Sequence, residues 1–170
     1  ACAVCDGALP VFRDQPLAVV GGGDTAMEEA SYLTKFASRV HVIHRRGEFR
    51  ASRTMQARIL ENPKATVHWW KAVVDVVGKD FIEAVVLEDT RDQSRSTLPV
   101  KGLFIAIGHT PLTQFLKGQI ATDPTGYVKL ADPWRTTTNV EGVFAAGDVA
   151  DSTYRQAVTA AGMGCMAALE

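Results

Sequence analysis

The sequence predicts an α/β fold, and three observations at its start predict it. An apolar, partly β-branched run, Leu17–Val20, ends in three glycines, as expected of a buried strand that enters a tight turn. Small and apolar residues then recur at helical spacing from Ala26 to Ala37, which predicts a helix of about three to four turns. A second strand, Val40–His44, completes a β-α-β unit with parallel strands and a right-handed crossover.

The next elements predict an antiparallel insertion in this α/β unit. A helix with apolar residues at Met55, Ile59 and Leu60 is expected to close at Asn62-Pro63. Short connections join the segments that follow, which favours an antiparallel meander over further crossovers. The expected strands are Thr66–Val77, Phe81–Glu88 and Thr97–Ile107.

The regular pattern stops near Pro111, where we expect a domain boundary. A Pro- and Asp-rich region follows, with one short strand candidate near Tyr127–Leu130. A last strand, Gly142–Gly147, and a helix from about Tyr154 to Leu169 find no β-α-β partner in the chain, so we expect them to end a domain whose beginning is absent. The predicted divisions are residues 1–13 (a dithiol segment and linker), 14–110 (a nucleotide-binding domain) and 111–170 (the end of a second α/β domain).

Composition excludes several classes of protein. Hydrophobic residues make up 46% of the chain and charged residues 22%, as in ordinary globular proteins. The net charge of −1 gives no electrostatic case for nucleic acid or an anionic membrane as partner. Apolar runs such as Gly102–Gly108 have the length of strands and fall far short of a membrane span.

The loop after the first strand has the pattern of a dinucleotide-binding fingerprint, Gly21-x-Gly23-x-x-Ala26. The first glycine allows the tight turn, the second lets the backbone approach a pyrophosphate, and the small third residue lets helix and strand pack closely. The N-terminus of the helix adds N–H donors and a favourable dipole for phosphate. The alternative is a glycine-rich turn without a ligand. Because a strand, a helix and a second strand surround the loop, we predict a Rossmann-like dinucleotide site.

A second string, Gly162-x-Gly164-x-x-Ala167, fits the same pattern without a preceding strand. Here we expect small residues that allow a helix to pack closely. Cys165, which lies among them, is expected to be a small buried hydrophobic residue.

The end of the second strand predicts which nucleotide binds. His44 is followed by Arg45 and Arg46, with Arg50 one helical turn beyond, where an NAD site would place an acidic residue. Guanidinium groups suit a 2′-phosphate. Two such hydrogen bonds, each about 1.5–3 kcal/mol, imply a preference on the order of a hundredfold for NADP(H) over NAD(H). A solvated basic turn is the alternative.

Cys2 and Cys5 have the spacing of a reversible disulfide oxidoreductase pair. A structural zinc site is the main alternative, but it needs four ligands and no second pair completes a set, so we predict no metal. Asp6 follows directly and could relay the proton that a thiolate gains or loses, or could be a turn residue. An odd count of three cysteines favours a reducing compartment over a structural disulfide framework.

Six motifs in one order resemble low-molecular-weight NADPH-dependent thioredoxin reductases, over essentially all 170 residues. They are Cys-x-x-Cys-Asp-Gly, Gly-Gly-Gly-Asp-Thr-Ala-x-Glu-Glu-Ala, His-Arg-Arg-x-x-x-Arg, Ala-Ile-Gly-His-Thr-Pro, Gly-Val-Phe-Ala-Ala-Gly-Asp-Val and Tyr-Arg-Gln-Ala-Val-Thr-Ala-Ala-Gly. The sequence is most similar in type to plant, algal and cyanobacterial forms, including plastid enzymes with a fused thioredoxin.

The resemblance implies a flavoenzyme in which NADPH reduces FAD, FAD reduces a Cys2–Cys5 disulfide, and the dithiol reduces thioredoxin. Asp6 would be the proton donor, and the second domain would be the end of an FAD domain. The residues implied for the cofactors are Gly22, Gly23, Asp24 and Thr25 for pyrophosphate and ribose, Arg45, Arg46 and Arg50 for the 2′-phosphate, Ile107, Gly108 and His109 near the nicotinamide, Gly147 and Asp148 for the FAD ribitol, and Arg155, Gln156 and Ala157 against the flavin ring.

One departure from the family is large, because its upstream Gly-x-Gly-x-x-Gly segment for the ADP part of FAD is not in this sequence. We therefore expect the chain to bind NADPH, to hold FAD weakly or not at all, and to be inactive alone. A free or fused thioredoxin, a homodimer at full length, and the cytoplasm or chloroplast stroma are the expected partners and location. The alternatives are an NADH-dependent peroxiredoxin-reducing flavoprotein and a non-catalytic NADP(H)-binding module.

Overall fold

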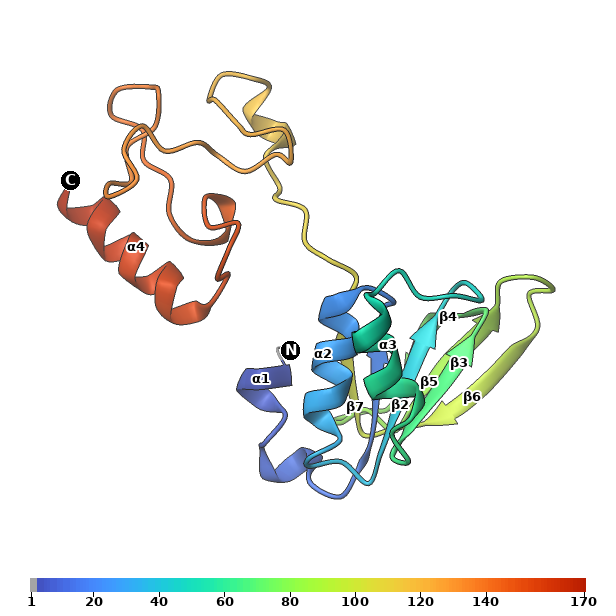
Figure 1. Cartoon of the computed structure of the whole chain (residues 1–170). Helices are drawn as coiled ribbons and strands as arrows, with labels where there is room; N and C mark the ends of the chain where they lie inside the picture. The colour runs from blue at the N-terminus through green and yellow to red at the C-terminus, as the bar shows by residue number, and fades with distance from the viewer. Residues whose placement is uncertain (1–2) are drawn as a thin grey trace. The chain divides into compact units, whose positions relative to one another are not determined.

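A computed structural model describes residues 3–170 of the chain (Figure 1). The chain divides into two compact units, the first ending at Gly108 and the second spanning His109–Glu170. Among the described residues, no helix is both long and apolar enough to cross a membrane.

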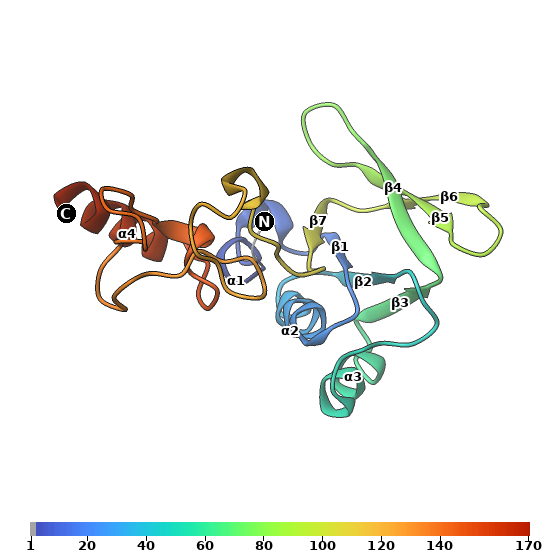
Figure 2. The same cartoon turned by 90° about the horizontal axis from the view of Figure 1, so that it is seen from above.

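The first unit is built on a four-stranded parallel sheet with the strand order β3-β2-β1-β7. Helices α2 and α3 cover one face of this sheet (Figure 2). The elements are α1 (Ala3–Asp6), a 3-10 turn (Pro10–Phe12), β1 (Pro16–Val20), α2 (Asp24–Leu33), β2 (Arg39–His44), α3 (Arg53–Leu60), β3 (Ala65–Trp69) and β7 (Gly102–Ile105).

A three-stranded antiparallel sheet covers the other face of the parallel sheet (Figure 2). It consists of β4 (Lys71–Val77), β5 (Ala84–Asp89) and β6 (Arg95–Pro99), in that order. Ala18 and Ile43 of the parallel sheet pack with Val85 and Leu87 of β5 in a second hydrophobic cluster. The predicted fold class, a Rossmann-like parallel sheet with an antiparallel insertion, is confirmed.

Two of the expected strands are each divided in two, which corrects the prediction. The segment Thr66–Val77 bends at Trp70, whose φ is 58°, so that β3 joins the parallel sheet and β4 the antiparallel one. The segment Thr97–Ile107 is broken at Val100 and Lys101, between β6 and β7. Pro99 and Gly102 flank the second break, whereas no glycine or proline marks the bend at Trp70, where a continuous run of strand-forming residues hid the change of sheet.

The first long helix is shorter than expected, because α2 ends at Leu33. Ala37 is still fully buried, in the loop before β2. Ala37 thus keeps the apolar spacing of the helix although it is not helical, and this made the predicted helix too long. Strand β5 likewise begins at Ala84 and not at Phe81, which is 74% exposed.

The second unit contains two 3-10 turns, Gln114–Leu116 and Gly147–Val149, and the helix α4 (Ala157–Leu169). The two strands expected here are wrong: within His109–Glu170, Val128 and Phe144 each make only an isolated antiparallel bridge, to Thr122 and Thr137. A strand needs a partner along its whole length, and these segments find one only at single residues.

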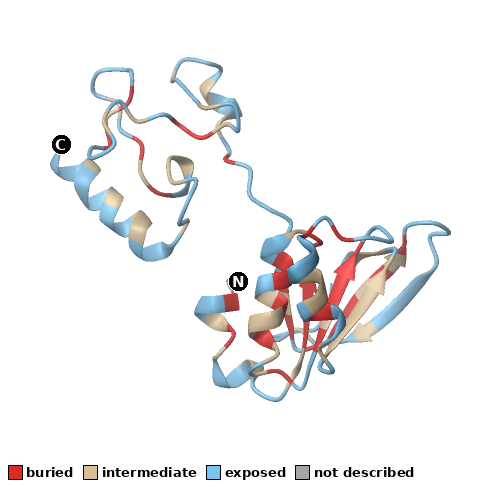
Figure 3. Ribbon diagram, viewed as in Figure 1, coloured by how far each residue is buried: buried red, intermediate tan, exposed pale blue. Residues whose placement is uncertain are grey.

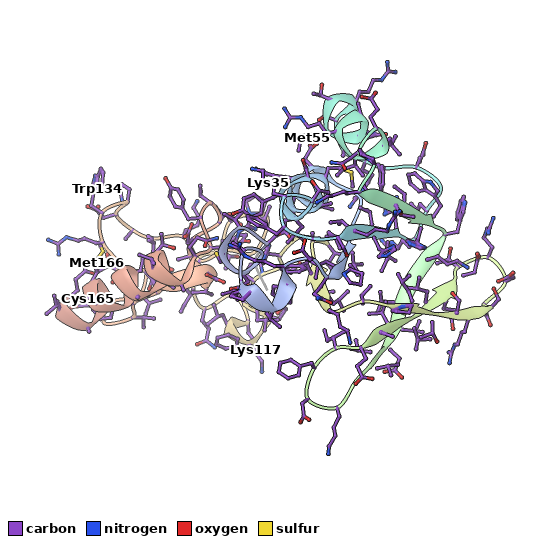
Figure 4. The ribbon with its side chains drawn as sticks, turned by 90° about the horizontal axis from the view of Figure 1, so that it is seen from below. Lys35, Met55, Lys117, Trp134, Cys165 and Met166 are labelled. Atoms are coloured by element: carbon purple, nitrogen blue, oxygen red, sulfur yellow. The ribbon has the colours of Figure 1, made fainter. Side chains whose placement is uncertain are left out.

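Helix α4 departs from the expectation of close packing. It has no buried residue within the described chain, and Cys165 is exposed (Figure 3, Figure 4). A Cβ atom added at Gly162 or Gly164 would meet nothing within 4 Å. The predicted burial of Cys165 is therefore wrong for this structure, since apolar composition gives a helix a face to bury but does not supply what covers it.

A histidine pair joins β2 to β3, where His41 Nδ1 lies 2.9 Å from His68 Nε2. Burial, and after it the charge effects of His68 and Arg39, lower the pKa of His41 to about 4. Burial also lowers the pKa of His68. Both rings are therefore neutral near pH 7, one donating and the other accepting.

This pair predicts a loss of stability in mild acid. The pKa of His41 is lower in the folded chain than its ordinary value of 6.5, so the unfolded chain binds more protons as the pH falls from 6.5 toward 4. The contribution is complete above this window and is lost within it, on the order of 1–2 kcal/mol after allowance for partial exposure. Urea unfolding at about pH 7 and about pH 5 measures it. His41→Gln should remove most of this difference and the exposed His109→Gln should not; a His41→Gln variant as acid-sensitive as the parent chain would contradict the assignment.

Candidate nucleotide-binding site

The three glycines after β1 face different surroundings. Gly21 has a φ of 155°, and a Cβ there would collide with the carbonyl oxygen of Ala106 and lie 2.7 Å from the Cβ of Ala26. A Cβ at Gly22 would collide with the imidazole of His44. Gly23, which caps the N-terminus of α2, has nothing within 4 Å of such a Cβ. Of the three, Gly23 is therefore the position with open space for a ligand.

The segment after β2 is hydrogen-bonded to the glycine turn. The backbone N–H groups of Arg50 and Ala51 donate to the carbonyl oxygen of Gly22, at 2.7 and 3.1 Å. The N–H of Ser52 donates to Asp24 Oδ1 at 2.8 Å. These three bonds place Arg50 next to the turn and occupy one carboxylate oxygen of Asp24.

The imidazole of His44 packs against the glycine turn at Gly22. The residue is 7% exposed, and its Nε2 lies 2.9 Å from the carbonyl oxygen of Glu48. Because a carbonyl can only accept, Nε2 carries the hydrogen. Burial lowers the pKa of His44, against the raising effect of the Glu48 bond, and the nearby arginines lower it further. A neutral His44 packed against Gly22 is therefore part of the site.

A cavity of about 520 Å³ opens at the carboxyl ends of β1, β2 and β7. Ligands bind at this end of the strands in open parallel α/β sheets. The cavity brings together five predicted residues, Gly21, His44, Arg45, Arg50 and Ile107. Its other lining residues are Val20, Ile43, Lys71, Ala72, Val73 and Ile105.

Lys71 is a cavity residue that the sequence reasoning missed. It begins β4, and its Nζ lies 3.0 Å from Asp89 Oδ2. Only the bend at Trp70 brings the antiparallel insertion to the cavity. No local motif contains Lys71. Only the pairing of β4 with the rest of the insertion could have indicated that Lys71 lies at the cavity.

Arg46 does not line this cavity. It lies at a separate shallow cavity of about 540 Å³, with Gly47, Glu48 and Trp70. Arg45, Arg46 and Arg50 are all exposed. Of the residues expected at the nicotinamide end, Gly108 closes the first unit and His109 begins the second.

The dithiol motif is described in part, because Cys2 lies outside the described residues. Cys5 and Asp6 belong to α1, where Cys5 is exposed. A Cβ at Gly7 would collide with the carbonyl oxygen of Ala3 and lie 2.6 Å from a methyl carbon of Leu33, so the end of α1 packs closely on α2. No group of three or more His, Cys, Asp or Glu side chains in the described chain could hold a metal ion.

In the second unit, Asp151 orders the approach to α4, a role that sequence reasoning missed. Its carboxylate accepts from the N–H groups of Thr153, Tyr154 and Arg155 and from Thr159 Oγ1. Burial alone would raise the pKa of Asp151, but the hydrogen bonds from Tyr154 and Arg155 outweigh it and the pKa is lowered. Arg155 has a φ of 50°, so the helix begins only at Ala157.

The predicted residues of the second unit lie around this carboxylate and the 3-10 turn. Gln156 and Thr159 form a reciprocal cap at the N-terminus of α4. Gly147 is buried and has a φ of 77°, and Asp148 is exposed beside it. Arg155 Nη1 donates to Tyr127 Oη at 3.4 Å.

Comparisons with known proteins identify the family. The family model described as pyridine nucleotide-disulphide oxidoreductase matches residues 1–164. Thioredoxin reductase 1, mitochondrial, of Arabidopsis thaliana is 56% identical over 173 residues, covering 100% of this chain and 46% of the relative. Thioredoxin reductase of Dictyostelium discoideum is 54% identical, covering 100% of this chain and 53% of the relative.

Solved structures agree with these relatives. The crystal structure of thioredoxin reductase from Streptococcus pyogenes matches with a TM-score of 0.83 and 41% identity, covering 99% of this chain and 54% of that one. Thioredoxin reductase from Giardia duodenalis matches with a TM-score of 0.77 and 43% identity, covering 99% and 55%. The chain spans about half the length of the curated relatives it matches. The chain belongs to the pyridine nucleotide-disulphide oxidoreductase family, and the relatives named above are thioredoxin reductases.

Proposed function

We propose that this chain carries the NADPH site and the dithiol of a thioredoxin reductase. In this proposal, reducing equivalents pass from NADPH through FAD to Cys2 and Cys5 and then to thioredoxin. The single observation that carries it is the cavity at the ends of the parallel strands, where the glycine turn meets Arg45 and Arg50. The names of the relatives supply the substrate class.

The described residues fit a 2′-phosphorylated dinucleotide. The open space at Gly23 and the N-terminus of α2 suit a pyrophosphate, which would accept from backbone N–H groups there. Arg45 and Arg50 would hold the 2′-phosphate, and Arg46 would reach it from the adjoining cavity. Thr25, exposed in the first turn of α2, would contact the phosphates or ribose.

The second unit fits one end of a flavin. The flavin would be held by Gly147 and Asp148 and by the N-terminus of α4 at Arg155, Gln156 and Ala157. A helix N-terminus stabilises negative charge on a reduced ring. When bound, FAD would carry two electrons between nicotinamide and disulfide. Asp6 would hold the proton exchanged with the thiols, and Ile107, Gly108 and His109 would lie toward the nicotinamide.

Several finer features stay predictions of this proposal. They are the plant, algal or cyanobacterial type, a thioredoxin partner that is free or fused, a homodimer at full length, and a cytoplasmic or chloroplast location. For the 170-residue chain we expect little or no flavin and no turnover alone. The visible absorbance of the purified chain measures its flavin content, and stoichiometric flavin would contradict this expectation.

The nucleotide assignment is tested by titrating the chain with NADPH and with NADH in a calorimeter. Two charge-assisted hydrogen bonds to the 2′-phosphate should make NADPH bind more tightly by on the order of a hundredfold. Equal dissociation constants would contradict the assignment and would favour the NADH-dependent alternative.

The dithiol assignment has its own test. The reduced chain is mixed with oxidised thioredoxin, and the free thiols of each protein are counted after separation. Two thiols should disappear from the chain and two should appear on thioredoxin, because exchange conserves electrons and protons. Cys165→Ser should exchange as the parent chain does and Cys5→Ser should not complete the exchange. A chain that binds NADPH without exchanging thiols would be a binding module.

A further inference from the structure

The antiparallel insertion contacts the backbone of the basic segment Arg45–Gly47. Thr90 Oγ1 donates to the carbonyl oxygen of Arg45 at 3.1 Å. The backbone N–H of Trp70 donates to the carbonyl oxygen of Arg46 at 3.3 Å. Neither bond uses a guanidinium group, so the insertion holds the backbone while both arginine side chains remain exposed.

Trp70 is itself held in an uncommon conformation. Its φ is 58°, and its carbonyl oxygen accepts from the N–H of Thr90 at 2.8 Å. The guanidinium of Arg91 lies over its ring, 5.5 Å from the centroid. Gly47 lies against the indole edge of Trp70, where an added Cβ atom would be 2.9 Å from Cε2. The side chain of Trp70 therefore limits where Gly47 can lie.

A buried carboxylate ties these groups together. Asp89 is 3% exposed and accepts from Lys71 Nζ at 3.0 Å and from Arg91 Nη2 at 2.8 Å. Its hydrogen bonds with Arg91 hold the pKa of Asp89 well below its usual range. The ionised carboxylate thus links Lys71, in the wall of the cavity, to Arg91, over the ring of Trp70.

We propose that Thr90 and Trp70 are positioning residues that set the preference of the cavity for a 2′-phosphorylated nucleotide. This inference rests on the proposed function. An arginine recognises phosphate only when its guanidinium is aimed, and a loop of consecutive exposed residues cannot aim it without support for its backbone. The insertion supplies that support at consecutive carbonyl oxygens. Specificity is thus determined in part by residues that need not touch the nucleotide.

The test compares the dissociation constants of NADPH and NADH for the 170-residue chain carrying Thr90→Val or Thr90→Ser. Valine keeps the shape of threonine and removes the hydroxyl, whereas serine keeps the hydroxyl. Loss of one hydrogen bond corresponds to about threefold to tenfold in affinity. Thr90→Val should weaken NADPH binding by about this factor and leave NADH within about twofold, and Thr90→Ser should retain the parent preference.

A second variant tests the same arrangement from the loop side. Gly47→Ala places a methyl group against the indole of Trp70 and should also lower the NADPH preference. Thr97→Val, at an exposed position of β6, is the matched control and should change neither constant. Thermal unfolding midpoints show whether each variant folds as the parent chain does.

The outcomes separate this inference from the proposed function. A parent chain without preference for NADPH would overturn both. A parent chain that prefers NADPH, with a folded Thr90→Val variant that keeps the whole preference, would overturn the positioning role alone. Equal weakening of NADPH and NADH would also overturn it, because a general structural role affects both nucleotides.

Discussion

Gly21→Ala is expected to destabilise the first unit by about 3 kcal/mol or more, whereas Gly23→Ala should leave its stability almost unchanged. At Gly21 the new Cβ meets the backbone carbonyl of Ala106, which cannot rotate away, and the φ of 155° is strained for alanine. At Gly23 the φ is −99° and the surrounding space is open. Urea unfolding of the two variants measures the difference.

The order of the two variants should reverse when nucleotide affinity is measured per folded molecule. Gly23→Ala should lose more affinity than Gly21→Ala. A methyl group at Gly23 takes up the space proposed for the pyrophosphate, so Gly23→Ala should raise the NADPH dissociation constant by about tenfold or more. Its loss of stability should stay under about 1 kcal/mol, because only a cap residue changes. A Gly23→Ala variant with unchanged affinity, or a Gly21→Ala variant of full stability, would show that the turn is described wrongly.

The double variant Arg45→Ala with Arg46→Ala is expected to raise the NADPH dissociation constant on the order of a hundredfold and to leave NADH nearly unchanged. Only the 2′-phosphate distinguishes NADPH from NADH. Both arginine side chains are exposed, and both would contact this phosphate in the proposed function. The effect should shrink as salt is added, since exposed charges are screened. Calorimetry at low and at physiological ionic strength measures it.

A matched control removes the same charge elsewhere. Arg53→Ala with Arg58→Ala deletes two exposed arginines of α3 that do not line the cavity at Arg45. It should alter the preference for NADPH by no more than about twofold. Of the single variants, Arg45→Ala should have the larger effect, because Arg46 lines only the adjoining cavity. Equal losses for NADPH and NADH in the double variant would refute 2′-phosphate recognition.

Local signals predicted the core of the first unit well. The sequence Leu17–Val20, the glycine turn, α2 and β2 each carry their own pattern, and each was confirmed within a few residues at its ends. Gly21, His44, Arg45, Arg50 and Ile107 could be gathered into one site because consecutive parallel strands end at the same edge of a sheet. The sequence therefore predicted five of the eleven residues that line this cavity.

The remaining features depended on contacts between distant segments. Nothing local marks the bend at Trp70, which sends β3 and β4 to different sheets and brings Lys71 to the cavity. The strand predicted at Gly142–Gly147 forms a single bridge, because strand propensity cannot provide a neighbour. Cys165 was expected to be buried for the same reason and is exposed in the described chain.

By itself, the sequence determined the family, the order of the elements around the glycine turn and the residue types available for a phosphate. The family follows from the resemblance of six ordered motifs, and the elements and residue types follow from periodicity and spacing along the chain, which are local properties. Only the tertiary structure decided that Gly23, among the three glycines, faces open space and that Thr90 and Trp70 hold the basic segment. Such contacts join residues far apart in the chain, and their free energy depends on packing that no local pattern encodes.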